Sequence, residues 1–167
     1  PYNVEVDREL TVDINALIHT DFTINKLRRR LRVEGGTTHL GQILFFKKII
    51  EKYQRGITRC TPRFRNDAFS RYDWEIYADL HESFEQALTK NGVDYLDTLR
   101  KKANPEDILL YFTRAVECDG GIAVKQKHRK LIGEIFLGSK NAIYVRRLGE
   151  IIMRELNVPV YYCTDCN

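Results

Sequence analysis

Cysteine and proline are scarce in this 167-residue sequence, with four of each, and ten glycines are spread along it. Four cysteines are too few for a disulfide-stapled fold, and so little proline and glycine excludes a collagen-like or linker-like chain. No apolar run approaches the ~18 residues that span a bilayer. No signal-peptide pattern opens the sequence, so we expect an intracellular protein, in the cytoplasm or nucleus. Whether the chain is a fragment of a longer protein stays open.

The common catalytic and nucleotide-binding motifs are also missing. Neither G-x-x-x-x-G-K-[ST] nor G-x-G-x-x-G occurs, which argues against a phosphate-cradling glycine loop. Neither G-x-S-x-G nor H-E-x-x-H occurs. With 43% hydrophobic and 30% charged residues, the chain is a normal globular protein whose sequence announces no reaction. We therefore expect a binding domain rather than an enzyme.

Apolar residues recur mostly at helical spacing, and turn or capping residues separate the segments. This pattern predicts helices over residues 10–18, 24–33, 38–54, 70–90, 93–103, 105–119, 124–137 and 139–157. Asn104-Pro105 gives the clearest helix start, because asparagine caps a helix and proline suits its first turn. We expect a mainly α fold, a single compact domain (1–167) of seven or eight helices. The sequence allows a subdivision near residues 57–69 and at most a minor two-stranded element from the termini, and no internal repeat is evident.

Charge is strongly segregated along the chain, although the total is only +4. Residues 26–71 carry 13 basic residues against three acidic ones, while residues 72–118 carry five basic and ten acidic residues. Arginine binds phosphate through a fork of donors, and aromatic rings stack on unpaired bases. We therefore predict a non-catalytic nucleic-acid-binding surface, for DNA or RNA, with these residues: Lys26, Arg28, Arg29, Arg30, Arg32, Arg55, Arg59, Arg63, Phe64, Arg65, Arg71, Lys125, Lys127, Arg129 and Lys130.

Other interpretations of the basic block remain open. It would also suit a protein–protein interaction module that docks on an acidic partner, within a larger assembly. The arginines would alternatively pair with the chain's own acidic residues Glu75, Asp79 and Glu82. A helix-turn-helix over residues 24–54 fits in outline, but its second helix is too apolar to read a major groove well.

Metal and catalytic candidates are few. Cys163 and Cys166 have the C-x-x-C spacing of half a zinc site or of a redox pair, so zinc is the one cofactor to consider. Glu75, Asp79 and Glu82, with His81 beside them, would suit a metal-dependent nuclease if they lay on one helix face.

Overall fold

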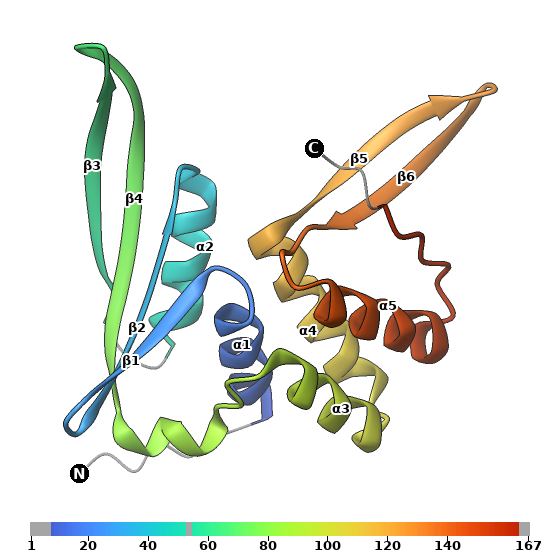
Figure 1. Cartoon of the computed structure of the whole chain (residues 1–167), viewed down its shortest axis with the longest axis horizontal. Coiled ribbons are helices and arrows are strands. Elements are labelled where there is room, and N and C mark those ends of the chain that lie inside the picture. The colour runs from blue at the N-terminus through green and yellow to red at the C-terminus, as the bar shows by residue number, and fades with distance from the viewer. Residues whose placement is uncertain (1–7, 53–54, 164–167) are drawn as a thin grey trace. The chain divides into compact units, whose positions relative to one another are not determined.

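A computed structural model describes residues 8–52 and 55–163 (Figure 1). The chain divides into two compact units. Unit 1 comprises Asp21–Leu88, and unit 2 comprises Arg8–Thr20 and residues 89–163. Within the described residues no helix is long and apolar enough to cross a membrane.

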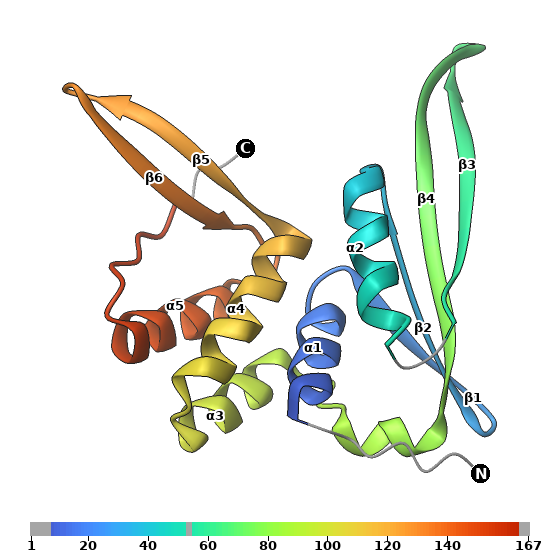
Figure 2. The ribbon, with the colours of Figure 1, turned by 180° about the vertical axis from the view of Figure 1, so that it is seen from behind.

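Unit 1 is built on a four-stranded antiparallel sheet with the strand order β1-β2-β4-β3. The strands are β1 (Phe22–Leu27), β2 (Arg30–Thr37), β3 (Ile57–Arg65) and β4 (Ala68–His81). Helix α2 (Leu40–Ile50) lies against one face, and the short 3-10 helix η1 (Glu82–Ala87) follows β4. No described helix of unit 1 lies over the other face (Figures 1 and 2). The sheet therefore has one covered face and one open face.

Strict alternation along the strands produces the covered face. Ile76, Ala78 and Leu80 on β4 are buried, and their partners Leu31 and Val33 on β2 are buried beside them. Phe22 on β1 meets Phe46 of α2 edge to face, with 4.6 Å between ring centroids. Its ring lies over Gly35, where a Cβ would come within 2.8 Å of it. The glycine thus lets the first strand close against the helix.

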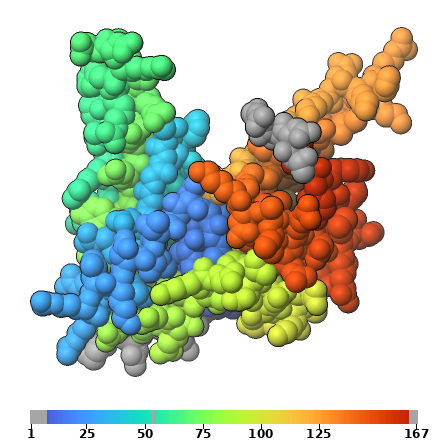
Figure 3. Space-filling view, in the orientation of Figure 1, coloured from blue at the N-terminus to red at the C-terminus, as the bar shows by residue number. Residues whose placement is uncertain are grey.

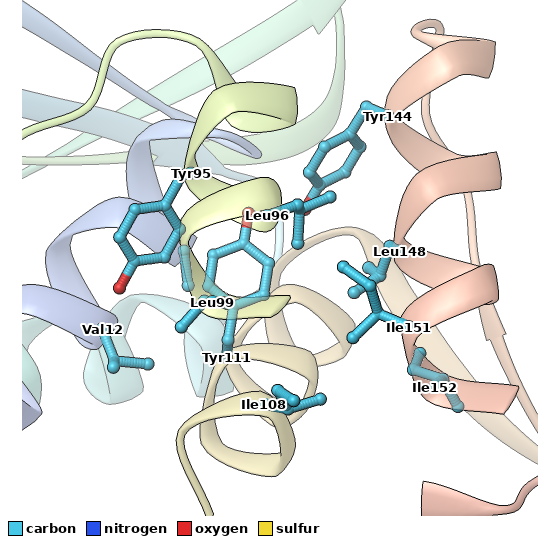
Figure 4. Close-up of a cluster of buried hydrophobic side chains, with 11 residues drawn as sticks. Val12, Tyr95, Leu96, Leu99, Ile108, Tyr111, Tyr144, Leu148, Ile151 and Ile152 are labelled. Atoms are coloured by element: carbon cyan, nitrogen blue, oxygen red, sulfur yellow. Dashed lines mark hydrogen bonds between the residues drawn. The ribbon is translucent and has the colours of Figure 1, made fainter. Parts of the chain in front are cut away.

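Unit 2 contains four helices and one hairpin. The helices are α1 (Arg8–Ile18), α3 (Gly92–Lys102), α4 (Pro105–Asp119) and α5 (Ala142–Leu156), and the hairpin joins β5 (Gly120–Lys127) to β6 (Lys130–Leu137). The helices share a hydrophobic cluster, whose 11 buried members are drawn in Figure 4. Asparagine side chains at positions 91, 104 and 141 cap α3, α4 and α5. Asn104 and Pro105 start α4 as predicted.

The two units contain matching hairpins 100 residues apart. β2 and β6 each span eight residues, starting at Arg30 and Lys130, and both follow a two-residue turn. Each hairpin follows a helix and precedes another: α1 and α2 flank the first, and α4 and α5 flank the second. The structure thus contains a repeated helix-hairpin-helix pattern that the sequence does not make evident.

The expectation of a mainly α fold was wrong. The described residues form a mixed α/β structure in which the segments 24–33, 57–81 and 124–137 are strands. Apolar residues at 74, 76, 78 and 80 alternate with polar ones, a period of two that favours a strand over a helix. The helices α1, α2, α3, α4 and α5 were predicted correctly.

The expected β element at the termini is not confirmed. Residues 158–163 form neither helix nor strand, and the N-terminal residues 1–7 lie outside the described residues. The strands that do form come from the middle of the chain, where the hairpin turns lack the glycine that usually reveals them.

A buried ion pair joins α1 to α4 inside unit 2. The Nε of Arg114 donates to the fully buried carboxylate of Asp13 at 2.7 Å, and another nitrogen of Arg114 bonds Glu117. Arg8 near the start of α1 pairs with Asp107 near the start of α4, so the two helices run in parallel.

We expect Arg114→Ala to lower the free energy of unfolding by about 3 kcal/mol, because it removes this cation from a buried carboxylate. Arg154→Ala serves as control: Arg154 is exposed and pairs with Glu155 at the surface, so the loss should stay below about 1 kcal/mol. Urea unfolding followed by circular dichroism measures both. Equal losses would show that the buried pair has no special role.

A hydrogen-bond chain runs from His19, just after α1, to α5. The Nε2 of His19 lies 2.6 Å from the carbonyl of Thr89, so it must donate there, and Nδ1 accepts from the hydroxyl of Tyr111 at 2.8 Å. The hydroxyl of Tyr111 lies 3.0 Å from that of Tyr144. Burial lowers the pKa of His19 below its ordinary value of 6.5, and burial raises the pKa of Tyr144 to about 12. The imidazole of His19 in this hydrogen-bond chain is therefore neutral at pH 7.

The lowered pKa makes stability depend on pH. Below pH 6.5 the unfolded chain binds a proton at His19 that the folded chain resists, so the free energy of unfolding should fall as pH drops from 7 to 5. His19→Gln should remove this part of the pH dependence, and His39→Gln controls for loss of an exposed imidazole. Urea midpoints across the pH range measure it. A pH slope that His19→Gln leaves unchanged would contradict the assignment.

Candidate nucleic-acid interface

The open face of the unit 1 sheet gathers five of the predicted arginines. Residues that pair across antiparallel strands project from the same side of the sheet. Every second side chain of β2 and of β4 projects from the open face. On β3, Arg59 and Arg63 project from the same face, because they pair with Glu75 and Arg71 of β4. The basic members of this surface, which we call the arginine face, are Arg30, Arg32, Arg59, Arg63 and Arg71.

Side chains of β4 hold the central arginines in place. Arg32 donates from Nε and Nη2 to the two carboxylate oxygens of Asp79, at 2.7 and 3.1 Å, and Arg30 lies 3.9 Å from the same group. The hydrogen bond from Arg32 keeps the pKa of Asp79 below its usual range. The guanidinium carbons of Arg32 and Arg59 lie 4.8 and 5.1 Å from the ring centroid of Tyr77. Both guanidinium groups thus lie over the ring of one tyrosine.

Asp73 likewise binds two arginines, farther along the β3–β4 hairpin. It accepts from the Nε of Arg63 and from the Nε of Arg71, the latter at 3.0 Å. The bond from Arg63 lowers the pKa of Asp73, so the carboxylate stays charged over the physiological range. Each guanidinium has five N–H donors, so these contacts leave donors available for another ligand.

Four more predicted cations lie at the turns or ends of the strands. They form no ion pair with any described residue. Arg28 and Arg29 form the turn between β1 and β2, Arg55 precedes β3, and Arg65 ends β3. All four are exposed. The backbone of Arg28 is left-handed, with φ of 48°. These cations stand at the rim of the sheet rather than on it.

Two predicted residues lie on the opposite side of the sheet. Lys26 pairs with Glu85 of η1 at 2.6 Å. Phe64 belongs to a row of rings on the helix-side face of the β3–β4 hairpin, with neighbouring centroids 4.9–6.3 Å apart: Phe64, Phe69, Tyr72 and Trp74. The sequence interleaves arginine with these four aromatic residues, but the strands place the four rings on the face opposite the arginines.

The remaining predicted cations belong to the hairpin of unit 2. Lys125 pairs with Glu134 across β5 and β6. Lys127, Arg129 and Lys130 surround the turn and are exposed. This hairpin carries a second basic cluster, in unit 2.

The helix-turn-helix and a metal site built on Glu75, Asp79 and Glu82 receive no support from the described residues. No three or more histidine, cysteine or acidic side chains gather as a metal-binding group anywhere in residues 8–52 and 55–163. Cys163 is exposed, and Cys166 lies outside the described residues. Glu75 and Asp79 project from a strand, with Asp79 bound to Arg32, rather than from a helix face. Residues 24–33 form a hairpin, so the first helix of a helix-turn-helix does not exist.

Sequence reasoning missed Tyr77 and Asp73, which orient the arginines. Asp79 was named as an internal partner for arginine, and the structure confirms that pairing. The signal for all three was the period of two along residues 73–80, in which each second residue is polar or aromatic.

The sequence matches no protein-family model and no curated protein. The structure is similar to that of the homing endonuclease I-WcaI bound to its DNA recognition sequence. The match has a TM-score of 0.56 and 13% sequence identity, and it covers 97% of this chain and 74% of that one. Such a low identity shows a likeness of fold.

Proposed function

We propose that this chain binds double-stranded DNA through the arginine face of unit 1. The observation that carries the proposal is the set of five arginines on three adjacent strands of an uncovered sheet face, oriented by Asp73, Tyr77 and Asp79. The similarity of fold to a DNA-bound homing endonuclease supports it.

The two-stranded form of the β3–β4 hairpin suits a DNA groove. The hairpin extends beyond α2 as a two-stranded ribbon (Figures 1 and 3). A two-stranded β-ribbon fits the major groove of B-DNA, and arginine donates two hydrogen bonds to the O6 and N7 of guanine there. Arg59, Arg63 and Arg71 on this ribbon are the candidates for reading bases.

We infer that the arginine face and the rim cations make different kinds of contact with DNA. The carboxylates beside the face arginines cancel much of their net charge but fix their geometry, which favours selective contacts over general attraction. The rim cations Arg28, Arg29, Arg55 and Arg65 keep their full charge, which favours contact with phosphates. Phosphate contacts set affinity and its salt dependence, whereas base contacts set specificity.

This division makes opposite predictions for the two groups. Arg28→Ala with Arg29→Ala should weaken binding to all DNA sequences and flatten the slope of log K against log salt by roughly one unit for each lost contact. Arg63→Ala should cost about 1–3 kcal/mol on a preferred sequence, first obtained by selection from random duplexes, and much less on random DNA. Fluorescence anisotropy measures both.

Arg100→Ala is the matched control, because this exposed arginine belongs to α3 in unit 2 and is not a member of the arginine face. It should leave affinity and slope as in the wild type. An unchanged slope after the double substitution would overturn the assignment of phosphate contacts. A wild-type chain that binds an acidic protein but no DNA would favour the interaction-module alternative.

DNA cleavage is the second candidate function, and the position of Asp119 favours it. Asp119 is the last residue of α4, and the last turn of this helix also holds Glu117 but no basic residue. A carboxylate at a helix C-terminus opposes the helix dipole, at a cost of about 0.3–1 kcal/mol, so stability does not explain it. In unit 1, Asp21 stands in the same sequence position before β1 and accepts from Gln42 at 3.3 Å. Magnesium in phosphoryl-transfer sites commonly uses one or two protein carboxylates plus substrate phosphates.

Incubation of supercoiled plasmid with the chain and Mg²⁺ tests cleavage. We expect Asp119→Asn to reduce cleavage at least 100-fold while DNA binding is retained, because it removes a carboxylate that would hold the metal ion beside the substrate phosphate. Glu75→Gln on the arginine face is the control and should still cut. Intact plasmid with the wild type would exclude the nuclease function but leave the proposal of DNA binding standing.

A further inference from the structure

Arg63 and Arg71 lie directly opposite each other on the β3–β4 hairpin and share one carboxylate. They are register partners across the two strands, and Asp73, two residues beyond Arg71 on β4, projects from the same face. The Nε of Arg63 donates to Oδ2 of Asp73 at 2.5 Å, and the Nε of Arg71 donates to Oδ1 at 3.0 Å. Each carboxylate oxygen thus accepts from one arginine. We call these three residues the Asp73 clamp.

The carboxylate of Asp73 allows two like charges to lie side by side. Residues directly opposite across antiparallel strands have Cβ atoms about 4.5–5.5 Å apart, and like charges in such a pair repel each other. The side chain of Asp73 is 22% exposed, whereas those of Arg63 and Arg71 are 58% and 62% exposed. The carboxylate is therefore largely covered, while the two guanidinium groups that it holds are exposed.

The clamp leaves the same donors unused on both arginines. Because both bonds to Asp73 use Nε, the terminal nitrogens Nη1 and Nη2 of Arg63 and Arg71 form no hydrogen bond with a described residue. Two such donors match the O6 and N7 acceptors that guanine presents in the major groove. Arg32 differs, because its Nε and Nη2 both donate to Asp79. The Asp73 clamp thus presents two unoccupied guanidinium forks next to each other.

We propose that the Asp73 clamp binds guanine in two neighbouring base pairs of duplex DNA, one guanine through each arginine. This inference rests on the proposed DNA binding by unit 1 and names the bases that the ribbon selects. Successive base pairs are about 3.4 Å apart along the helix axis, a spacing that two flexible side chains starting about 5 Å apart reach easily. Asp73 contacts no base in this arrangement and acts as the positioning residue for both arginines.

The charge of Asp73 distinguishes this role from a general contribution to binding. A carboxylate on a DNA-binding face repels phosphates, so Asp73 lowers the attraction of the face for DNA of any sequence. Its benefit lies in holding both guanidinium groups in the geometry that guanine requires. Removal of the charge should therefore raise affinity for random DNA and lower the preference for guanine, whereas a loss of folded structure would lower both.

Duplexes containing 7-deazaguanine test the contact with guanine, because this base lacks the N7 acceptor while every phosphate is retained. The parent duplex is selected by the wild-type chain from random sequences, and each guanine is replaced in turn. We expect two neighbouring positions at which the replacement raises the dissociation constant about tenfold. Arg63→Ala should abolish this sensitivity at one position and Arg71→Ala at the other. Fluorescence anisotropy measures the dissociation constants.

Asp73→Asn tests the positioning role, with Glu75→Gln as its matched control. Glu75 is exposed on the same face of β4, two residues from Asp73, and forms no ion pair with a described residue. Both substitutions remove one negative charge, so both should raise affinity for random DNA about twofold. Only Asp73→Asn should reduce the sensitivity to 7-deazaguanine, and it should do so at both positions. Circular dichroism checks that each variant is folded.

The outcomes separate this inference from the proposed function. A wild-type chain that binds duplex DNA equally well with and without the N7 atoms would overturn the guanine contacts and leave DNA binding standing. Equal loss of guanine sensitivity in Asp73→Asn and Glu75→Gln, or a weaker affinity of Asp73→Asn for random DNA, would overturn the positioning role. A wild-type chain that binds no duplex DNA would overturn both proposals.

Discussion

The alternation of side chains along antiparallel strands is the constraint on which the interface of unit 1 depends. Because neighbouring residues project to opposite faces, one run of residues supplies both the core and the binding surface. Ile76 and Leu80 are buried on the covered face, while Tyr77 and Asp79 between them lie on the arginine face. A shift of register by one residue would bury the arginines and expose the core, so folding energy itself fixes which face is basic.

The sequence predicted the helices well because their ends carry chemical signals. Asn104 and Pro105 mark the start of α4, and asparagine likewise caps α3 and α5. The strands were missed because Ile24, Leu27 and Leu31 also satisfy helical spacing, and because the turn at Arg28 lacks glycine. Tertiary pairing with β4, some 45 residues away, decides in favour of the strand, and no local pattern carries that information.

The basic character of residues 26–71 was predictable from charge alone, but its spatial arrangement was not. The acidic segment that follows contributes Asp73 and Asp79 to the same face, where they orient the arginines rather than cover them. Phe64 was expected beside the arginines, yet strand geometry places it on the other side. The sequence therefore identified most residues of the arginine face, and the cross-strand register determined which of them lie on the same face.

Two hairpin turns place a charged residue in an unfavourable, left-handed backbone conformation. Arg28 and Arg129 have φ of 48° and 64°, in the left-handed region that costs a residue with a side chain about 1 kcal/mol relative to glycine. Glycine would relieve this strain at each turn, but it would also remove a cation from the tip of a ribbon. At these two turns a charged side chain is present at the cost of some stability. Glycine substitutions that raise the melting temperature would therefore remove positive charge from the tips of the β1–β2 and β5–β6 hairpins.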